Sequence, residues 1–192
     1  MKGKRSEYES DRSLLSRAVD NPESDGGREA ASELLGRYRD RVYIWCYRYV
    51  REHEHASDLA QDVLLNAYRN LSAFAGRSSF PSWLFAIARN RCISEMRRAS
   101  ILHDDSVEPE DLASDDHDPA VDLEEWQDEQ TLLALIRERL TPVEQEAIWM
   151  RCVERMPLDA ITRILRIDQR SGARGVLQQA RRKLRVALDT KG

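Results

Sequence analysis

The sequence holds 192 residues, of which 41% are hydrophobic and 33% are charged. This composition is typical of one large or two small globular domains and excludes a low-complexity chain. No apolar run approaches the ~18 residues that a membrane span needs, and the polar N-terminus predicts no signal peptide. The three cysteines lie far apart, as expected of a reduced, cytoplasmic protein without a zinc ribbon or a disulfide framework.

Residues 1–29 are mostly polar, and a short helix is expected over residues 13–19 within them. From about residue 30 to residue 49, apolar residues recur at three- and four-residue steps, which predicts an amphipathic helix. The segment REHEH that follows is typical of a turn or a fraying helix end.

A second helix is predicted from Ser57, which suits the N-cap position, to about Phe74. A loop over residues 75–81 then leads to a third helix. The first half of that helix is apolar almost all round, and its end near residue 98 is basic. We therefore expect residues 30–98 to form the first domain, a helical bundle.

The net charge of −4 conceals an uneven distribution along the chain. Residues 99–129 contain 13 acidic residues and no lysine or arginine, so the rest of the chain carries 30 basic and 21 acidic residues. Such a segment cannot bury enough apolar surface to fold alone, and we predict a flexible acidic linker. The basic parts on either side indicate two modules that meet a polyanion.

Residues 130–192 are predicted to form a second helical domain, with helical periodicity resuming around Trp126. The run Thr141-Pro142-Val143-Glu144 predicts a capping box with proline at the first helical position. Pro157 opens another short helix. Alternating β-branched residues are absent from the sequence, so the whole chain is predicted to be all-α.

The last two predicted helices have the layout of a helix-turn-helix, in which a short helix precedes a basic recognition helix. Eight basic residues and one acidic residue lie from Arg163 to Arg185. This charge favours DNA binding over the alternative of a solvated basic surface helix. The recognition helix begins after either Asp168 or Ser171, and the sequence leaves both starts open.

One face of the second helix, opposite its predicted core face, carries Asp58, Gln61, Asp62 and Leu65. Leu65 stands out because it is a large apolar residue among charges. A partner that buries Leu65 and pairs with the carboxylates would explain all four residues. The residues alone favour the simpler alternative, a solvated face with one stray leucine.

The loop RSSFPSW combines Arg77 with the aromatic residues Phe80 and Trp83. Arginine and exposed rings suit single-stranded nucleic acid, because bases stack on aromatic faces. The competing interpretation makes the rings core anchors; it is favoured for Trp83 and evenly balanced with base stacking for Phe80.

No catalytic or metal site is expected from the sequence. Cys46, His53 and His55 do not share a helix face, and no further ligand is evident. No phosphate loop, H-E-x-x-H or G-x-S-x-G motif occurs. We therefore expect no enzyme, no metal and no cofactor.

Taken in order, these segments resemble an extracytoplasmic-function RNA polymerase sigma factor. The family's first conserved domain is resembled by three segments, ELLGRYRDRVYIWCYRYV, DLAQDVLLNAYRNLSAF and SSFPSWLFAIARNRCISEMRR. The most specific part of this resemblance is the combination of D-L-x-Q-D with W-L-x-x-I-A-x-N. The family's second conserved domain is resembled by LTPVEQEAIWMRCVERMPLDAITRIL and by the arginine-rich helix that follows it. The resemblance covers residues 30–98 and 130–188. It implies a region 2-like bundle and a region 4-like helix-turn-helix.

The resemblance also implies a role for each surface in promoter-specific transcription initiation. Core polymerase binding is implied for the stripe of Asp58, Gln61, Asp62 and Leu65. Melting and reading of the minus-ten element are implied for Arg77, Ser78, Ser79, Phe80, Trp83, Arg89, Asn90 and Arg91. Contact with the minus-thirty-five element is implied for Arg170, Arg174, Gln178, Arg181 and Arg182.

The chain departs from the family pattern in the helix-turn-helix. Arg166 stands where the turn usually has glycine, and one extra residue separates the turn from the last helix. We therefore predict a weaker or shape-based second DNA contact. The expected partners are core polymerase, promoter DNA and an anti-sigma factor, without membrane insertion. A sigma-like protein that sequesters an anti-sigma factor and a helix-turn-helix regulator are the alternatives.

Overall fold

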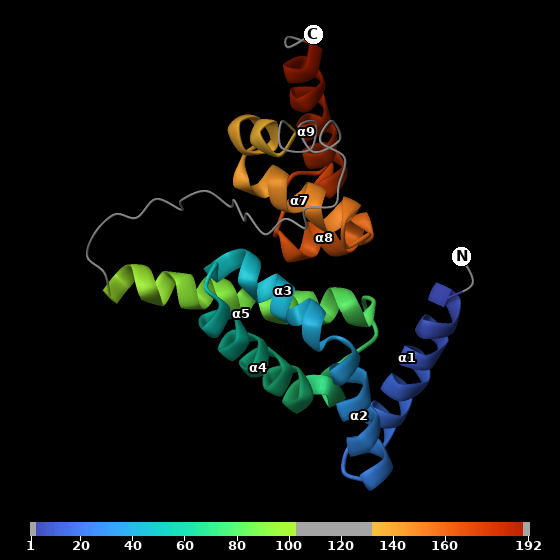
Figure 1. Cartoon of the computed structure of the whole chain (residues 1–192). Helices are drawn as coiled ribbons and strands as arrows, with labels where there is room; N and C mark the ends of the chain where they lie inside the picture. Colours follow the sequence, from blue (N-terminus) through green and yellow to red (C-terminus); the bar gives the residue numbers. More distant parts are fainter. Residues whose placement is uncertain (1–2, 103–131, 190–192) are drawn as a thin grey trace. The chain divides into compact units, whose positions relative to one another are not determined.

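A computed structural model of the chain describes residues 3–102 and 132–189, which consist of helices joined by turns and short loops (Figure 1). They belong to two units, Met1–Glu108 and Pro109–Gly192. The all-α prediction is confirmed for these residues. The acidic linker predicted over residues 99–129 lies outside them, apart from its first four residues, which continue a helix.

The N-terminal unit begins with two packed helices, α1 (Gly3–Asp20) and α2 (Asp25–Arg37). α1 lies along α2 (Figure 1) and buries Leu14 and Ala18. The prediction of only a short helix over residues 13–19 is therefore wrong, because tertiary packing of this apolar side stabilises a much longer helix. The domain boundary predicted at residue 30 falls inside α2.

The helix predicted over residues 30–49 is two helices, because α2 gives way to α3 (Arg39–Val50) at Tyr38. The Tyr38 backbone, with φ −101° and ψ 0°, leaves helical geometry while its N–H still donates to the carbonyl of Leu35 at 3.0 Å. Its side chain is buried, and its hydroxyl donates to Asp11 Oδ2 at 2.6 Å. This contact with α1 fixes a bend that periodicity alone does not reveal.

α4 (His53–Asn70) follows α3 after a turn of two residues. Arg51 takes the left-handed conformation with φ 55°, and Glu52 is the N-cap of α4. The Glu52 carboxylate accepts the N–H groups of the second and third helical residues at 2.8 and 2.6 Å. These hydrogen bonds hold the pKa of Glu52 below its usual range. The prediction of Ser57 as the N-cap is therefore wrong, since the helix begins one turn earlier.

α4 ends in a single 3₁₀ turn, and a short loop leads to α5 (Phe80–Leu102). Ser79 is the N-cap of α5: its carbonyl accepts the N–H of Trp83 at 3.0 Å, and its Oγ accepts the N–H of Ser82 at 3.4 Å. α5 thus starts inside the predicted loop and runs four residues past the predicted end at residue 98.

The core of this unit lies among α3, α4 and α5, which pack pairwise against one another (Figure 1). Trp45 of α3 meets Phe85 of α5 edge to face, with ring centroids 5.1 Å apart, and both are fully buried. Val63 of α4 and Leu84 of α5 are also fully buried. This packing leaves the opposite faces of α4 and α5 to solvent.

The C-terminal unit contains a helix over residues 132–139, then α7 (Pro142–Cys152), α8 (Leu158–Ile164) and α9 (Gly172–Asp189). The capping box predicted at the start of α7 is present, with proline in the first turn. Pro157 is the N-cap of α8, as expected. Trp126, where helical periodicity resumes, lies outside the described residues.

Candidate functional surfaces

The stripe predicted on α4 exists as a surface. Its members are exposed, whereas the core face of the same helix is buried. The members of the stripe are Asp58, Gln61, Asp62 and Leu65. Leu65 is 54% exposed although it is apolar, which makes it the feature of this face that a partner would explain.

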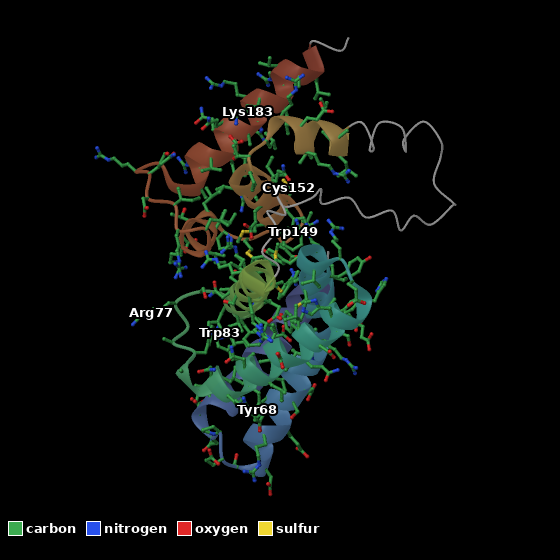
Figure 2. All side chains as sticks on the ribbon, turned by 90° about the vertical axis from the view of Figure 1, so that its left-hand side faces the viewer. Tyr68, Arg77, Trp83, Trp149, Cys152 and Lys183 are labelled. Atoms are coloured by element: carbon green, nitrogen blue, oxygen red, sulfur yellow. The ribbon has the colours of Figure 1, made fainter. Side chains whose placement is uncertain are left out.

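Tyr68 extends the stripe and was missed by the sequence analysis. It is 39% exposed (Figure 2). Tyr68 lies three residues after Leu65, so the helical spacing places the two residues on one side of α4. The same three-residue step from Leu65 is the sequence signal that could have found it. With Tyr68 included, the surface pairs an apolar end with an acidic end.

Two of the predicted surfaces meet at a single guanidinium. Arg91 of α5 donates from Nη2 to Asp62 Oδ2 of α4 at 2.9 Å and from Nη1 to Glu95 Oε2 at 2.6 Å. Hydrogen bonds to Glu95 and to Asp62 raise the pKa of Arg91, and the hydrogen bond from Arg91 lowers the pKa of Glu95. Arg91 was assigned to DNA and Asp62 to polymerase, yet they form an ion pair here.

An aromatic cluster anchors both ends of the loop before α5. Phe80 lies within ring-contact distance of three aromatic rings, at centroid separations of 5.3 Å from Tyr38, 6.1 Å from Phe74 and 5.7 Å from Trp83. Phe80 is only 5% exposed, so its ring face is not offered to a base. Of the two interpretations that the sequence leaves open for Phe80, the burial of its ring favours the core anchor over base stacking. Trp83 is half-buried in the same cluster, as its favoured interpretation expects.

The loop between these anchors presents polar groups to solvent. Gly76 has φ +65°, a conformation that favours glycine. Arg77 is exposed and reaches outward from the loop (Figure 2), and Ser78 is half-buried beside it. Ser79 is exposed, although its hydroxyl is used in the N-cap of α5. Farther along α5, Asn90 is exposed and Arg89 is half-buried.

The turn of the helix-turn-helix closes α8 with a Schellman motif. The N–H of Ile167 donates to the carbonyl of Thr162 at 3.0 Å, and the N–H of Arg166 donates to the carbonyl of Arg163 at 3.3 Å. Arg166 has φ 51°, the left-handed conformation that glycine adopts at lower cost. The replacement of glycine noted in the sequence therefore leaves the backbone motif intact, with strain at Arg166.

The start of the recognition helix is fixed by α8. α9 begins at Gly172, so of the two starts left open by the sequence the structure has the one after Ser171. Thr162 Oγ1 accepts the N–H of Ala173 at 2.8 Å and donates to the carbonyl of Leu158 at 2.8 Å. Gly172 has φ +54°, and a Cβ there would lie 2.8 Å from Thr162 Oγ1. Glycine is thus required where the two helices touch.

α9 is strongly two-sided. Ala173, Val176, Ala180 and Ala187 are buried along one side. The residues assigned to the minus-thirty-five element are all exposed. They are Arg170, Arg174, Gln178, Arg181 and Arg182. Arg185 is exposed four residues after Arg181 and was not among the predicted residues, although its spacing on the helix places it on the same side.

An ion pair with a buried carboxylate holds α9 against α7. Lys183 donates to Glu144 Oε2 at 2.7 Å, and Glu144 is 4% exposed. Burial opposes the ionisation of Glu144, but hydrogen bonds from Lys183 and from both the backbone and the hydroxyl of Thr141 outweigh it and lower its pKa. Lys183 is therefore a structural residue in the middle of the basic helix.

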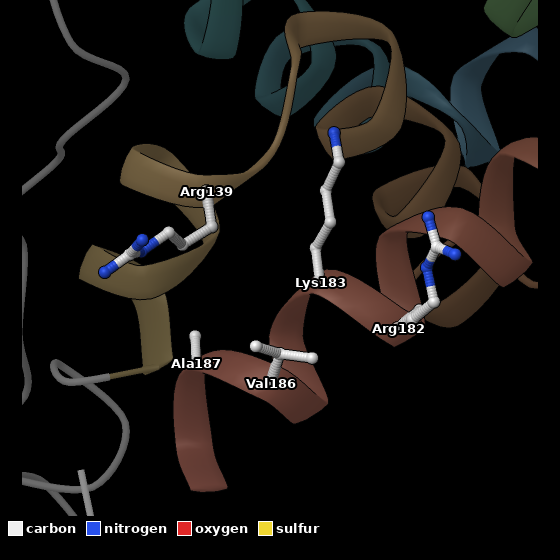
Figure 3. A pocket seen from close by; sticks show the side chains of 5 residues that line it. All are labelled: Arg139, Arg182, Lys183, Val186 and Ala187. Carbon is white, nitrogen blue, oxygen red and sulfur yellow. The ribbon is translucent and has the colours of Figure 1, made fainter. Parts of the chain in front are cut away.

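A shallow groove lies beside this ion pair, between α9 and the helix over residues 132–139 (Figure 3). It is lined by Arg139, Arg182, Lys183, Val186 and Ala187. The charged side chains among these described lining residues are all basic.

The chain is similar to known proteins over most of the N-terminal unit. Residues 34–101 match the model of the family described as Sigma-70 region 2. This segment is therefore similar to sigma-70 region 2. It contains the whole α4 stripe, the anchored loop and Arg91. Its curated relatives include extracytoplasmic-function sigma factors, in agreement with the resemblance drawn from the sequence.

Two curated relatives show the extent of the similarity. The ECF RNA polymerase sigma factor SigW of Bacillus subtilis is 33% identical over 73 residues, which cover 38% of this chain and 39% of that protein. The ECF RNA polymerase sigma-E factor of Escherichia coli is 32% identical over 93 residues, which cover 46% of this chain and 48% of that protein. These matches span less than half the length of either relative.

Solved structures extend the likeness of the fold beyond region 2. The sigma factor RpoE of Bartonella quintana, solved with the anti-sigma factor NepR, has a TM-score of 0.60 at 20% identity and covers 82% of this chain and 96% of its own. CnrH, solved with the cytosolic domain of CnrY, has a TM-score of 0.59 at 20% identity and covers 95% and 99%. At this identity the likeness establishes the fold.

None of the described helices is long and apolar enough to cross a membrane. Residues 3–102 and 132–189 contain no group of three His, Cys, Asp or Glu side chains arranged to hold a metal ion.

Proposed function

We propose that this protein is a sigma factor of the extracytoplasmic-function group, which binds core RNA polymerase in the cytoplasm and directs initiation at specific promoters. The observation that carries the proposal is the exposed Leu65 beside carboxylates on α4, within the segment similar to sigma-70 region 2. Polymerase would bury Leu65 and Tyr68 and would pair basic groups with Asp58 and Asp62.

The promoter contacts follow from the same assignment. The loop with Arg77 and Ser78 would meet the minus-ten element, with Phe80 positioning the loop from beneath and Asn90 facing the adjacent duplex. The exposed arginines of α9 would meet the minus-thirty-five element through phosphates. This division makes the chain a specificity subunit without catalysis of its own.

An anti-sigma factor is a further expected partner. RpoE of Bartonella quintana was solved with the anti-sigma factor NepR, and CnrH was solved with the cytosolic domain of CnrY. We propose that such a partner would compete with polymerase for the α4 stripe, because an exposed apolar face can be covered by only one of them at a time.

The test reverses a charge on the stripe without disturbing the core. Asp58 is exposed and forms no ion pair with another described residue, so Asp58→Arg should reduce affinity for core polymerase at least tenfold while circular dichroism stays unchanged. Glu29→Arg, at an exposed position on α2, is the matched control and should leave the affinity unchanged. Equal affinities for both variants would contradict the proposal, and no polymerase binding by the wild type would favour the anti-sigma decoy.

A further inference from the structure

The ion pair between Asp62 and Arg91 joins two surfaces that the proposed function gives to different partners. Asp62 lies on the α4 stripe assigned to polymerase, and Arg91 lies on the part of α5 assigned to DNA. The two side chains are bonded at 2.9 Å in the free chain. A carboxylate and a guanidinium that are paired with each other are less available to outside partners of opposite charge.

The second partner of Arg91 has a different effect. Glu95 lies one turn along the same helix and bonds Nη1 at 2.6 Å, and its side chain is 18% exposed. It therefore holds the guanidinium in position from α5 itself, while its other oxygen, Oε1, lies 3.9 Å from Nε2 of His55 on α4, outside the stripe. Asp62 occupies the other nitrogen, Nη2, and its side chain is 54% exposed, so it can be reached by a partner. Only the Asp62 contact bridges the two surfaces.

We propose that the Asp62–Arg91 ion pair couples polymerase binding to DNA contact. The proposal rests on the proposed function. A cationic group of polymerase that pairs with Asp62 releases Nη2 of Arg91, and the freed N–H donates to a DNA phosphate. Glu95 is the positioning residue that keeps the guanidinium aimed during the exchange. Before polymerase binds, the pair limits DNA binding by the free chain.

The size of the effect follows from the exposure of the pair. Ion pairs between partly exposed side chains contribute little, so the coupling is worth roughly two- to fivefold in affinity. Coupling between two sites is reciprocal, so DNA contact by Arg91 favours polymerase binding at Asp62 to the same extent. A released guanidinium also adds about one phosphate contact to the salt dependence of DNA binding.

The first experiment uses the full chain without polymerase. Affinity for a short labelled DNA duplex of arbitrary sequence is measured by fluorescence anisotropy at several salt concentrations. Asp62→Asn should bind roughly two- to fivefold more tightly than Asp58→Asn, which removes the same charge from the same stripe without releasing a cation. The salt slope of Asp62→Asn should be steeper by about one. Equal affinities for the two variants would overturn the proposal.

Arg91→Gln completes the cycle. It should change DNA affinity little in the wild-type background and should cancel the gain in the Asp62→Asn background. A gain that survives in the double variant would overturn the proposal, because it would come from net charge alone. Unchanged circular dichroism spectra establish that the variants remain folded.

The second experiment tests the link to polymerase. Arg91→Gln frees Asp62 and should raise the affinity of the chain for core polymerase, measured without DNA, by the same roughly two- to fivefold factor. An unchanged affinity would overturn the coupling. Failure of the proposed function is distinguishable, because it would appear as polymerase affinity that is insensitive to Asp58→Arg, whereas the DNA cycle does not involve polymerase.

Discussion

The two surfaces assigned to DNA are held in place by different forces. In the N-terminal unit, a loop is anchored at both ends by packed aromatic rings around Phe80. In the C-terminal unit, a helix is anchored by an ion pair between Lys183 and the buried carboxylate of Glu144 and by a hydroxyl cap from Thr162. Aromatic packing is insensitive to charge and pH, whereas an ion pair depends on both. The first contact is therefore expected to be the more robust of the two.

Removing the aromatic anchor should have the largest effect. Phe80→Ala deletes a buried ring that touches three others, so it should lower the free energy of unfolding of the N-terminal unit by about 3–5 kcal/mol. Hydrogen exchange of peptides from α3 to α5 would measure the loss. Arg77→Ala, in the exposed loop, should change stability by less than about 0.5 kcal/mol while weakening DNA binding. If Phe80→Ala weakened DNA binding with no loss of stability, the ring would be a base contact after all.

Breaking the ionic anchor should have a smaller effect, confined to the other unit. Lys183→Met keeps much of the apolar stem and removes the charge, so it should destabilise the C-terminal unit by about 1–3 kcal/mol. The reason is that Glu144 stays buried with an ionised carboxylate that has lost its strongest partner. Exchange of amides in α7 and α9 should accelerate, while α3 to α5 stay protected. Equal acceleration of amide exchange in both units would show that the ion pair does not stabilise the C-terminal unit alone.

Lowering the pH should reduce the stability that the ionic anchor contributes, but not the stability that the aromatic anchor contributes. The folded pKa of Glu144 is lower than its unfolded value, so its ionic stabilisation is present above the unfolded pKa and is lost as the pH falls through the folded pKa. The wild-type C-terminal unit should therefore lose more stability between neutral and acidic pH than the Lys183→Met variant does. Thermal unfolding at a series of pH values measures the difference. Parallel pH profiles for the two proteins would show that the pair contributes nothing.

Relieving backbone strain should produce the smallest change, and in the opposite direction. Arg166 is left-handed in the turn between α8 and α9, so Arg166→Gly should stabilise the C-terminal unit by about 1 kcal/mol. Gly172→Ala is the matched control. It should destabilise the same unit, because a Cβ there meets Thr162 and the backbone is again left-handed. Thermal unfolding of both variants would show whether adding a Cβ at a left-handed position lowers stability and removing one raises it.

The sequence predicted the elements whose signals are local. The capping box at Thr141, the helix opened by Pro157 and the exposed stripe around Leu65 all depend on residues within one or two turns of each other. Two of the failures are local, namely the N-cap Glu52 of α4 and the addition of Tyr68 to the stripe. The others, and the choice left open for Phe80, involve contacts between distant segments. The bend at Tyr38 depends on Asp11, the burial of Phe80 depends on rings from three elements, and the pairing of Arg91 with Asp62 joins two helices. Helical periodicity carries no information about such contacts.

Transcription in vitro would show whether this protein acts as a promoter-specificity subunit. Core RNA polymerase would be supplied with wild-type protein or with Asp58→Arg, and upstream DNA from the source genome would serve as template. With the wild type we expect new start sites that share an upstream motif, and with Asp58→Arg we expect loss of those starts. The absence of any new start, with the wild-type protein folded and core polymerase active, would contradict this role.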